Sequence, residues 1–523
     1  MKRYILAIDE GTTGVRGIVF DRNGDIVSQE YETISQIFPH PGWCEQNPEE
    51  IWEKCRRVMK GALEKIEISD IEAVGITTQR TTNLLWDRKS GKPIYNAITW
   101  QDTRTADICR KKDAMPKMRL IRGAGHLTKQ LSKLAPFLRK TTTGALLVSA
   151  SSLSFSPVTS LAHTRWILDN VEGAQKRAER GDVLFGTMDT WLIWKLTGGK
   201  VHATDFSSAG ATNMFDPFSA RWSKLFLDVF DIPDAILPEV RETCGEFGQM
   251  EREILGAELP IRSAVGDQSA AMFADGCFNP GDVKCTHGTG SFINMNVGHR
   301  PTGSMHRLLP LIAWKIKGMT TYMMEGMMKT TGSAVQWLKD NLHIIDDVAD
   351  SSRLAGSVDD TEGVYFVPAF TGLSSPYWDP HACGIVIGLS RKTTREHVVR
   401  AALEGIAYRC KDVLLAMETD TGLPVSSLKA DGGASANDFL LQFMADLLGV
   451  RVERPVMLDS TALGAAYLAG LASDFWSSTD ELREHQKIDR VFEPRMEREK
   501  REMLYEGWKR AVQRSFRWGH QRR

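Results

Sequence analysis

The sequence predicts an α/β protein of two domains, each built around a strand–turn–strand unit. With 523 residues, the chain is longer than one hydrophobic core normally serves. An apolar run, a Gly/Thr turn and a second apolar run occupy residues 4–20, and the same order returns at 283–297. We therefore predict a duplicated architecture with domains at 1–255 and 256–523.

Helices and strands alternate around these units. An Asn-Gly pair at 23–24 predicts a hairpin turn followed by a third strand. Apolar residues recur at helical spacing over 49–66, and 71–77 reads as a buried strand. In the second half, the sequence at 393–396 has the pattern of a capping box, and helical spacing continues to Met417.

The composition is that of an ordinary globular protein. Lys plus Arg number 65 against 66 Asp plus Glu, so overall charge gives no reason to expect nucleic acid or an anionic membrane as a partner. No stretch has the length of a membrane span, and Asp9 and Glu10 interrupt the first apolar run too early for a signal peptide. The eight cysteines are scattered without a C-x-x-C pair, which is typical of reduced thiols. We expect a cytoplasmic protein.

Two aspartates follow apolar runs. Asp9 precedes the turn at 11–14, whose amides and threonine hydroxyls can hold phosphate while the carboxylate holds hydrated Mg²⁺. An ordinary hairpin turn explains the same residues. Asp267 precedes a helix of small residues and can accept a proton from a substrate hydroxyl during phosphoryl transfer. It can equally be a helix cap.

Three further glycine turns lie at 288–290, at Gly332 and at 431–437. The chain has neither the G-x-x-x-x-G-K-[ST] phosphate loop nor a G-x-G-x-x-G dinucleotide turn. A nucleotide held between two domains accounts for all five turns together.

These motifs resemble those of the FGGY carbohydrate kinases, and within that family the members that phosphorylate glycerol. The matching segments are 7–13, 75–80, 91–101, 185–194, 364–373 and 375–380. The resemblance implies two actin-like (ribonuclease H-like) domains flanking a catalytic cleft. It also implies ATP-dependent phosphorylation of glycerol to sn-glycerol 3-phosphate.

The resemblance further implies roles for individual residues. Asp267 would be the general base, and Asp9 and Asp267 would reach Mg²⁺ through water. The substrate-binding positions are Arg80, Thr81, Trp100, Asp267, Gln268 and Phe292. The ATP-binding positions are Thr12, Thr13, Gly14, Arg16, Thr289, Gly332, Gln336, Gly433 and Asn437. The partner is then a small polyol, and a homodimer and a homotetramer are both compatible with the family.

Two features depart from the family. Members that phosphorylate glycerol have glutamate where this chain has Thr81, and an unreplaced carboxylate costs about 1.5–3 kcal/mol of binding. Residues 115–164 match nothing in the family. Val158 and His163 stand where it has a substrate-contacting tyrosine and a lysine. Read in a shifted frame, codons for 158–163 can spell Tyr-Phe-Ser-Gly-Thr, so an out-of-frame stretch and an authentic divergent loop both remain open.

Two other functions are weighed against this one. A kinase of another polyol or sugar would suit Thr81 and the missing tyrosine. An actin- or Hsp70-like ATPase would need a peptide-binding or filament-forming element, and the sequence suggests none. Residues 250–257 lack the glycine-rich, basic character of a fructose-bisphosphate site, so we expect no strong inhibition by that sugar phosphate.

Overall fold

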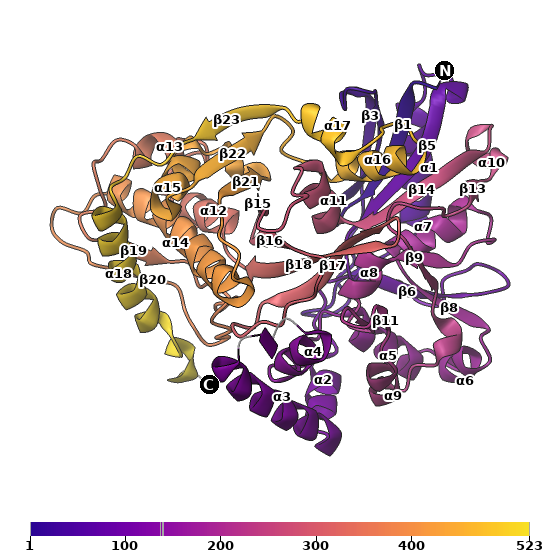
Figure 1. Ribbon diagram of the computed structural model, residues 1–523, viewed down its shortest axis with the longest axis horizontal. Helices are drawn as coiled ribbons and strands as arrows, with labels where there is room; N and C mark the ends of the chain where they lie inside the picture. Colours follow the sequence, from indigo (N-terminus) through magenta and orange to yellow (C-terminus); the bar gives the residue numbers. More distant parts are fainter. Residues whose placement is uncertain (1, 136, 139–140, 522–523) are drawn as a thin grey trace.

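The computed structural model describes residues 2–135, 137–138 and 141–521, and two β-sheets organise it (Figure 1). The first sheet has the order β13 (Gln249–Met250), β14 (Leu259–Gly266), β5 (Ile71–Thr78), β1 (Tyr4–Glu10), β2 (Gly14–Phe20), β3 (Ile26–Thr33). The second has the order β17 (Leu309–Ile316), β18 (Met319–Met328), β16 (Ser291–Gly298), β15 (Val283–His287), β21 (Ser427–Asp431), β22 (Arg451–Pro455), β23 (Ile488–Phe492).

The two sheets repeat one topology. In the first, β1, β2 and β3 are antiparallel neighbours, while β5 pairs parallel with β1 and β14 pairs parallel with β5. In the second, β15, β16 and β18 form the antiparallel part, and β21 and β22 run parallel beside β15. The predicted duplication and the α/β fold class are confirmed.

The predicted local elements form with small shifts. Asn47 caps α1 (Pro48–Ala62) at the expected helix, and Gly24 adopts the positive φ that the predicted hairpin turn requires. The capping box of α14 (Arg395–Thr421) lies one residue later than its sequence pattern. Thr394 is the N-cap, and His397 takes the reciprocal role expected of Glu396.

Helices cover both faces of the first sheet. α1 and α7 (Met188–Leu196) pack on one face, and α11 (Asp267–Ala274) and α16 (Thr461–Ala472) pack on the other. A side chain at Gly464 would place its Cβ 1.9 Å from the Ala270 carbonyl oxygen, so glycine lets α16 approach α11 closely. Since β14 and α16 follow residue 255, the first sheet and its covering helices draw on both predicted domains.

The second sheet packs against its own helices. The buried core on this side joins its strands to α14 and α15, with contributions from α12 and α13. These helices are α12 (Gly332–Asp340), α13 (Asp350–Ala355), α14 and α15 (Asp438–Leu448). The last helix, α18 (Arg498–Ser515), buries Trp508 against the same core.

A smaller subdomain extends the first sheet. Its four-stranded sheet has the order β4 (Glu45–Gln46), β7 (Ala97–Ile98), β6 (Asn83–Asp87), β8 (Val183–Thr187). Around it lie α2 (Ala106–Asp113), α5 (Ser160–Asn170), α6 (Ala174–Glu179) and α9 (Lys224–Phe230), whereas α8 (Phe206–Ala211) packs on β17.

The segment 115–164 forms α3 (Pro116–Leu134), α4 (Thr142–Ala150) and the start of α5, and α3 packs on α4 and contacts α2. Lys129 Nζ donates to the carbonyl oxygen of Met305, 2.8 Å away in the second half of the chain. Across the described residues, no helix is both long and apolar enough to cross a membrane.

Candidate active site

The predicted cleft residues gather where parallel strands end. Glu10 of β1 and Gly266 of β14 both lie opposite Thr78 of β5. The residues that follow these strands therefore meet at one edge, where ligands commonly bind in parallel sheets. This register brings Arg80 and Asp267 together.

Arg80 is held between two carboxylates. Its Nε lies 3.0 Å from Asp267 Oδ1, and its Nη2 lies 2.8 Å from Glu325 Oε2. Burial alone would lower the pKa of Arg80, but the two carboxylates outweigh it and raise the pKa. A Cβ at Gly266 would lie 2.8 Å from Arg80 Cγ, so this glycine makes room for the arginine.

Sequence reasoning missed Glu325. This buried residue of β18 also accepts a hydrogen bond from Asn294 Nδ2 at 2.9 Å. The predicted Phe292 ring lies beside the group, with its centroid 5.8 Å from the Arg80 guanidinium carbon. The available signal was a lone acid in the middle of the apolar strand around Met323 and Met324, because a buried charge needs a partner.

Thr81 and Trp100 lie near this group. Thr81 has a φ of 65°, an unusual conformation for a β-branched residue, and its buried hydroxyl has no hydrogen-bond partner among the residues that the structure describes. Trp100 Nε1 donates to Thr12 Oγ1 at 2.9 Å, which joins a predicted substrate position to a predicted phosphate position. The Thr12 carbonyl oxygen accepts a hydrogen bond from Gln46 at 2.7 Å.

Gln268 connects the cleft to a buried lysine that the sequence did not single out. Lys284 Nζ donates to Gln268 Oε1 at 3.3 Å and lies 3.7 Å from Asp431 Oδ2. Lys284 is fully buried. Asp431 immediately precedes the predicted nucleotide loop at Gly433, so one ammonium links the two sides of the site.

Asp9 lies in a strongly charged setting. Thr461 donates to its Oδ2 at 2.8 Å, and Arg16 Nη1 lies 3.8 Å from the same oxygen and also pairs with Asp459. Burial, with a further contribution from Asp459, raises the pKa of Asp9 to about 7. Negative charge at Asp9 is therefore only partly compensated by the protein.

The carboxylates of Asp9 and Asp267 are the groups expected to hold Mg²⁺. Among the described residues, no group of three or more His, Cys, Asp or Glu could hold a metal ion on its own. Asp9 and Asp267 interact electrostatically, and carboxylate oxygens are ligands that Mg²⁺ prefers. Two carboxylates suit an ion that keeps most of its water or takes phosphate oxygens, so the residues fit the expected ion.

The glycine turns of the second sheet also converge. Gly332 N donates to the Gly288 carbonyl oxygen at 3.0 Å, and Thr331 N donates to that of Thr289 at 3.0 Å. A Cβ at Gly432 would lie 2.7 Å from the His287 carbonyl oxygen, so the loop before Gly433 passes close to the end of β15. At Gly433 a Cβ would meet no described atom within 4 Å, which leaves that backbone open to a ligand.

Two other predicted nucleotide positions have contacts within the protein. Asn437 caps α15 through Leu440 N and donates to Ser351 Oγ at 3.0 Å. Gln336 donates to Asp340 one turn along α12 at 2.7 Å. The remaining positions, Thr13 and Gly14, lie in and directly after the turn between β1 and β2.

The position expected to carry lysine is filled by a buried histidine. His163 lies inside α5, where burial lowers its pKa to about 4 and keeps the ring neutral. Val158, at the expected tyrosine position, has no hydroxyl to offer a polyol.

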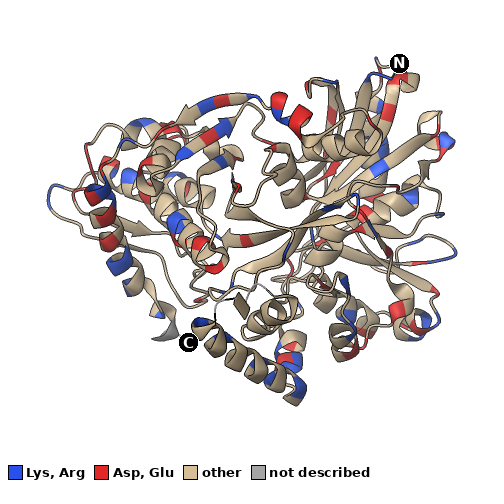
Figure 2. Ribbon diagram, in the orientation of Figure 1, with Lys and Arg blue, Asp and Glu red and all other residues tan. Residues whose placement is uncertain are grey.

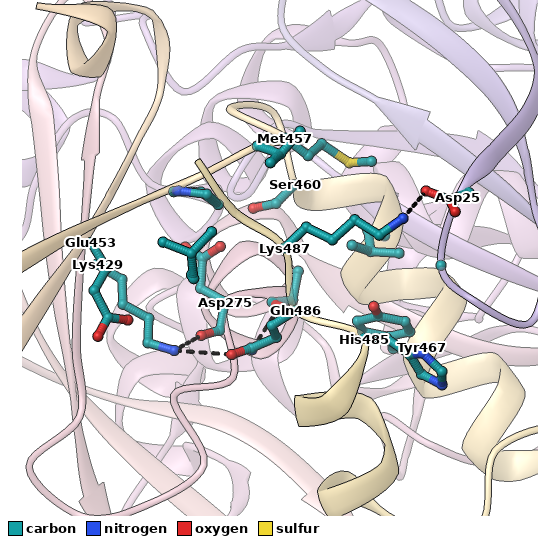
Figure 3. A pocket seen from close by; sticks show the side chains of 16 residues that line it. Asp25, Asp275, Lys429, Glu453, Met457, Ser460, Tyr467, His485, Gln486 and Lys487 are labelled. Atoms are coloured by element: carbon teal, nitrogen blue, oxygen red, sulfur yellow. Dashed lines mark hydrogen bonds and ion pairs between the residues drawn. The ribbon is translucent and has the colours of Figure 1, made fainter. Parts of the chain in front are cut away.

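A separate pocket lies elsewhere between the two halves. It is lined by groups including Asp25, Asp275, Lys429 and Lys487 (Figure 3). No residue predicted for the active site lines it.

Known proteins match this chain along its whole length. The profile of the N-terminal domain of the FGGY family of carbohydrate kinases matches residues 4–134 and 126–274, and that of the C-terminal domain matches 283–473. The chain belongs to this family. The match of this FGGY protein to the N-terminal profile comes in two parts that overlap at 126–134, and together they cover the whole segment 115–164. The prediction that this segment matches nothing in the family is therefore wrong.

Similar relatives carry one function in their names. A glycerol kinase from Caldanaerobacter subterraneus subsp. tengcongensis is 48% identical over 523 residues, covering 100% of both chains. Glycerol kinase 2 from Pseudomonas aeruginosa is 48% identical over 522 residues, 99% of this chain and 98% of its own. The crystal structure of Plasmodium falciparum glycerol kinase with ADP has a TM-score of 0.88 at 31% identity and covers 98% of each chain.

Proposed function

We propose that this FGGY kinase transfers the γ-phosphoryl group of ATP to glycerol and forms sn-glycerol 3-phosphate. The observation that carries the proposal is Asp267 at the end of β14, 3.0 Å from Arg80 in a chain similar to glycerol kinases along its whole length. Similarity to the glycerol kinases supports glycerol as the substrate, and the arrangement of Asp267 and Arg80 in the cleft supports the phosphoryl-transfer chemistry.

Each cleft residue has a role in the proposed reaction. Asp267 accepts the proton of the attacking hydroxyl as that oxygen bonds to the γ-phosphorus and the bond from that phosphorus to the bridging oxygen of ADP breaks, which releases ADP. Arg80 and Gln268 orient the polyol, and Trp100 and Phe292 flank its carbon chain. Arg80 is itself oriented by Glu325, which lies 2.8 Å from it. Its geometry is therefore fixed before substrate binds, which favours catalysis.

The nucleotide occupies the other side of the proposed site. The turn containing Thr12, Thr13 and Gly14, with Arg16, would hold phosphates, while the loops at Thr289, Gly332 and Gly433 would hold the nucleoside. Gln336 and Asn437 remain predicted contacts. Asp9 and Asp267 would hold Mg²⁺ through water, and the ion would neutralise phosphate charge.

The substitution Asp267→Asn tests the proposal. We expect a loss of about 10²–10⁴-fold in kcat, because the amide cannot take the proton, with ADP affinity largely retained. Asp480→Asn, an exposed acid far along the chain, is the matched control and should leave kcat unchanged. If Asp267→Asn keeps more than about a tenth of normal activity, Asp267 is not the base.

A kinase of another polyol or sugar is the second candidate, and Thr81 and Val158 favour it because both remove a polar partner for glycerol. Rates with glycerol, erythritol, xylitol and xylulose distinguish the two. A lower kcat/KM for glycerol than for a longer polyol would favour the second candidate. Cytoplasmic location and assembly into homodimers or homotetramers stay predictions.

A further inference from the structure

α3 presents a row of leucines to solvent. The row consists of Leu120, Leu127, Leu131 and Leu134, whose exposed fractions are 76%, 64%, 49% and 87%. Spacings of three, four and seven residues place them on one helix face together with Ala124. The face that carries Met118, Gly125 and Ser132 is buried against the protein. The helix therefore has two apolar faces, and only one of them is covered.

The charge of this segment has one sign. No Asp or Glu occurs between Asp113 and Asp169. On α3 itself the charged residues are Lys117, Arg119, Arg122, Lys129 and Lys133. Arg122 pairs with Asp113, and Lys129 donates to Met305, so these two point toward the protein.

The other three cations remain exposed beside the leucine row. Lys117, Arg119 and Lys133 make no ion pair within the described part of the chain. Arg119 and Lys133 each precede a leucine of the row by one residue, which places them about 100° around the helix from it. Exposed cations flanking an apolar row are typical of helices that lie in a membrane interface.

A second copy of the chain fits this face poorly. A helix of 19 residues is about 28 Å long and about 10 Å wide, so it presents roughly 300 Å² of surface. A standard stable interface covers about 800 Å² on each partner. Two copies would also bring like charges together.

An anionic bilayer fits the same face well. It needs no matching surface, it accepts leucines at the boundary between headgroups and acyl chains, and it attracts the flanking cations. Figure 1 shows α3 along the lower edge of the molecule, and the charged residues appear in Figure 2. A flat surface can therefore approach the helix.

We propose that α3 docks this protein on an anionic phospholipid surface, with the leucine row in the headgroup boundary and Lys117, Arg119 and Lys133 against lipid phosphates. The proposal depends on the residues that this chain carries in α3. It therefore holds whether the segment 115–164 is an out-of-frame stretch or an authentic divergent loop. It is independent of the proposed kinase activity, which serves below as a control for folding.

Vesicle flotation with the full chain tests the proposal. Vesicles of pure phosphatidylcholine are compared with vesicles that contain phosphatidylglycerol as a third of their lipid. We expect binding only to the anionic vesicles, and less of it at high salt. Leu127→Ser/Leu131→Ser should weaken binding by about tenfold or more, and so should Lys117→Gln/Arg119→Gln/Lys133→Gln.

Leu342→Ser/Leu389→Ser is the matched control, because both leucines are exposed on other parts of the surface. It should leave binding unchanged, and all variants should retain kinase activity and thermal midpoint. Equal binding to both vesicle types, or no effect of the leucine change, would overturn the proposal. So would the absence of vesicle binding together with a dimer, measured by sedimentation velocity, that the leucine change dissociates; that result would assign the face to a second copy.

Discussion

The side chains at the strand ends of the cleft and those of the helices α3 and α4 differ in how many contacts hold them in place. In the cleft, Arg80 is bound to partners from two different strand systems, Asp267 after β14 and Glu325 in β18. In the segment 115–164, the residues that α3 buries are Met118, Gly125 and Ser132. The cleft is specified by contacts that depend on one another, whereas the segment lies on the surface, where a changed sequence can be accommodated.

The largest expected effect tests the cleft, where buried side chains depend on one another. Lys284→Met removes a fully buried ammonium and leaves the buried Asp431 without its ion-pair partner. Breaking such a pair costs about 3–5 kcal/mol of stability. We expect a correspondingly lower thermal midpoint, measured by calorimetry without ligands.

A double variant separates charge from packing. In Lys284→Met/Asp431→Asn the buried negative charge is gone, so more than half of the lost stability should return. If the double variant is as unstable as the sum of both single changes, the pair does not act as a unit. The buried charges of the cleft would then depend on one another less than their distances indicate.

Much of the fold could be predicted because it depends on local patterns. Alternation of apolar runs and glycine turns predicted the duplicated units, and cap residues predicted α1 and α14. What the sequence did not reveal is long-range pairing. β14 returns to the first sheet after residue 255, and α16 packs on that sheet from a position some two hundred residues later. No local pattern encodes such partners.

The active site divides in the same way. Arg80 was found because it ends a matching segment, and Asp267 with Gln268 because they follow an apolar run and precede a helix of small residues. Glu325 and Lys284 were missed because each lies within a strand, and its role depends on a partner from elsewhere in the chain. A lone charge inside an apolar strand is the signal that finds such residues, since burial without a partner is costly.

Alanine substitutions of two buried methionines, one in α1 and one in α3, allow the stability of the two regions to be compared directly. Met59 of α1 and Met118 of α3 are both fully buried. Met59→Ala should cost about 2–5 kcal/mol, because the cavity opens in the core of the first sheet. Met118→Ala should cost about 1 kcal/mol or less, because α3 can open locally without unfolding the sheets.

Thermal unfolding of the two variants under one condition is the measurement. Hydrogen exchange supplies the control, since α3 amides should exchange through local opening while those of β1 and β5 exchange only through larger unfolding. Equal costs for the two alanines would mean that α3 belongs to the same cooperative unit as the sheets.

The smallest expected effect lies at Thr81, whose carbonyl oxygen accepts a hydrogen bond from Ser160 Oγ at 2.7 Å. Its hydroxyl is buried without a hydrogen-bond partner in the described part of the chain, and Arg80 beside it already contacts Asp267 and Glu325. Thr81→Glu would add a carboxylate for a substrate hydroxyl and would remove a β-branched residue from a φ of 65°. One added hydrogen bond is worth about 0.5–1.5 kcal/mol, so the KM for glycerol should fall by roughly two- to tenfold while kcat changes little. Thr81→Gln, whose side chain has the shape of glutamate without the charge, should lower the KM for glycerol by a smaller factor. An unchanged or higher KM for Thr81→Glu would mean that Glu325 already supplies the carboxylate lost at position 81, and that the cleft has compensated for its departure from the family.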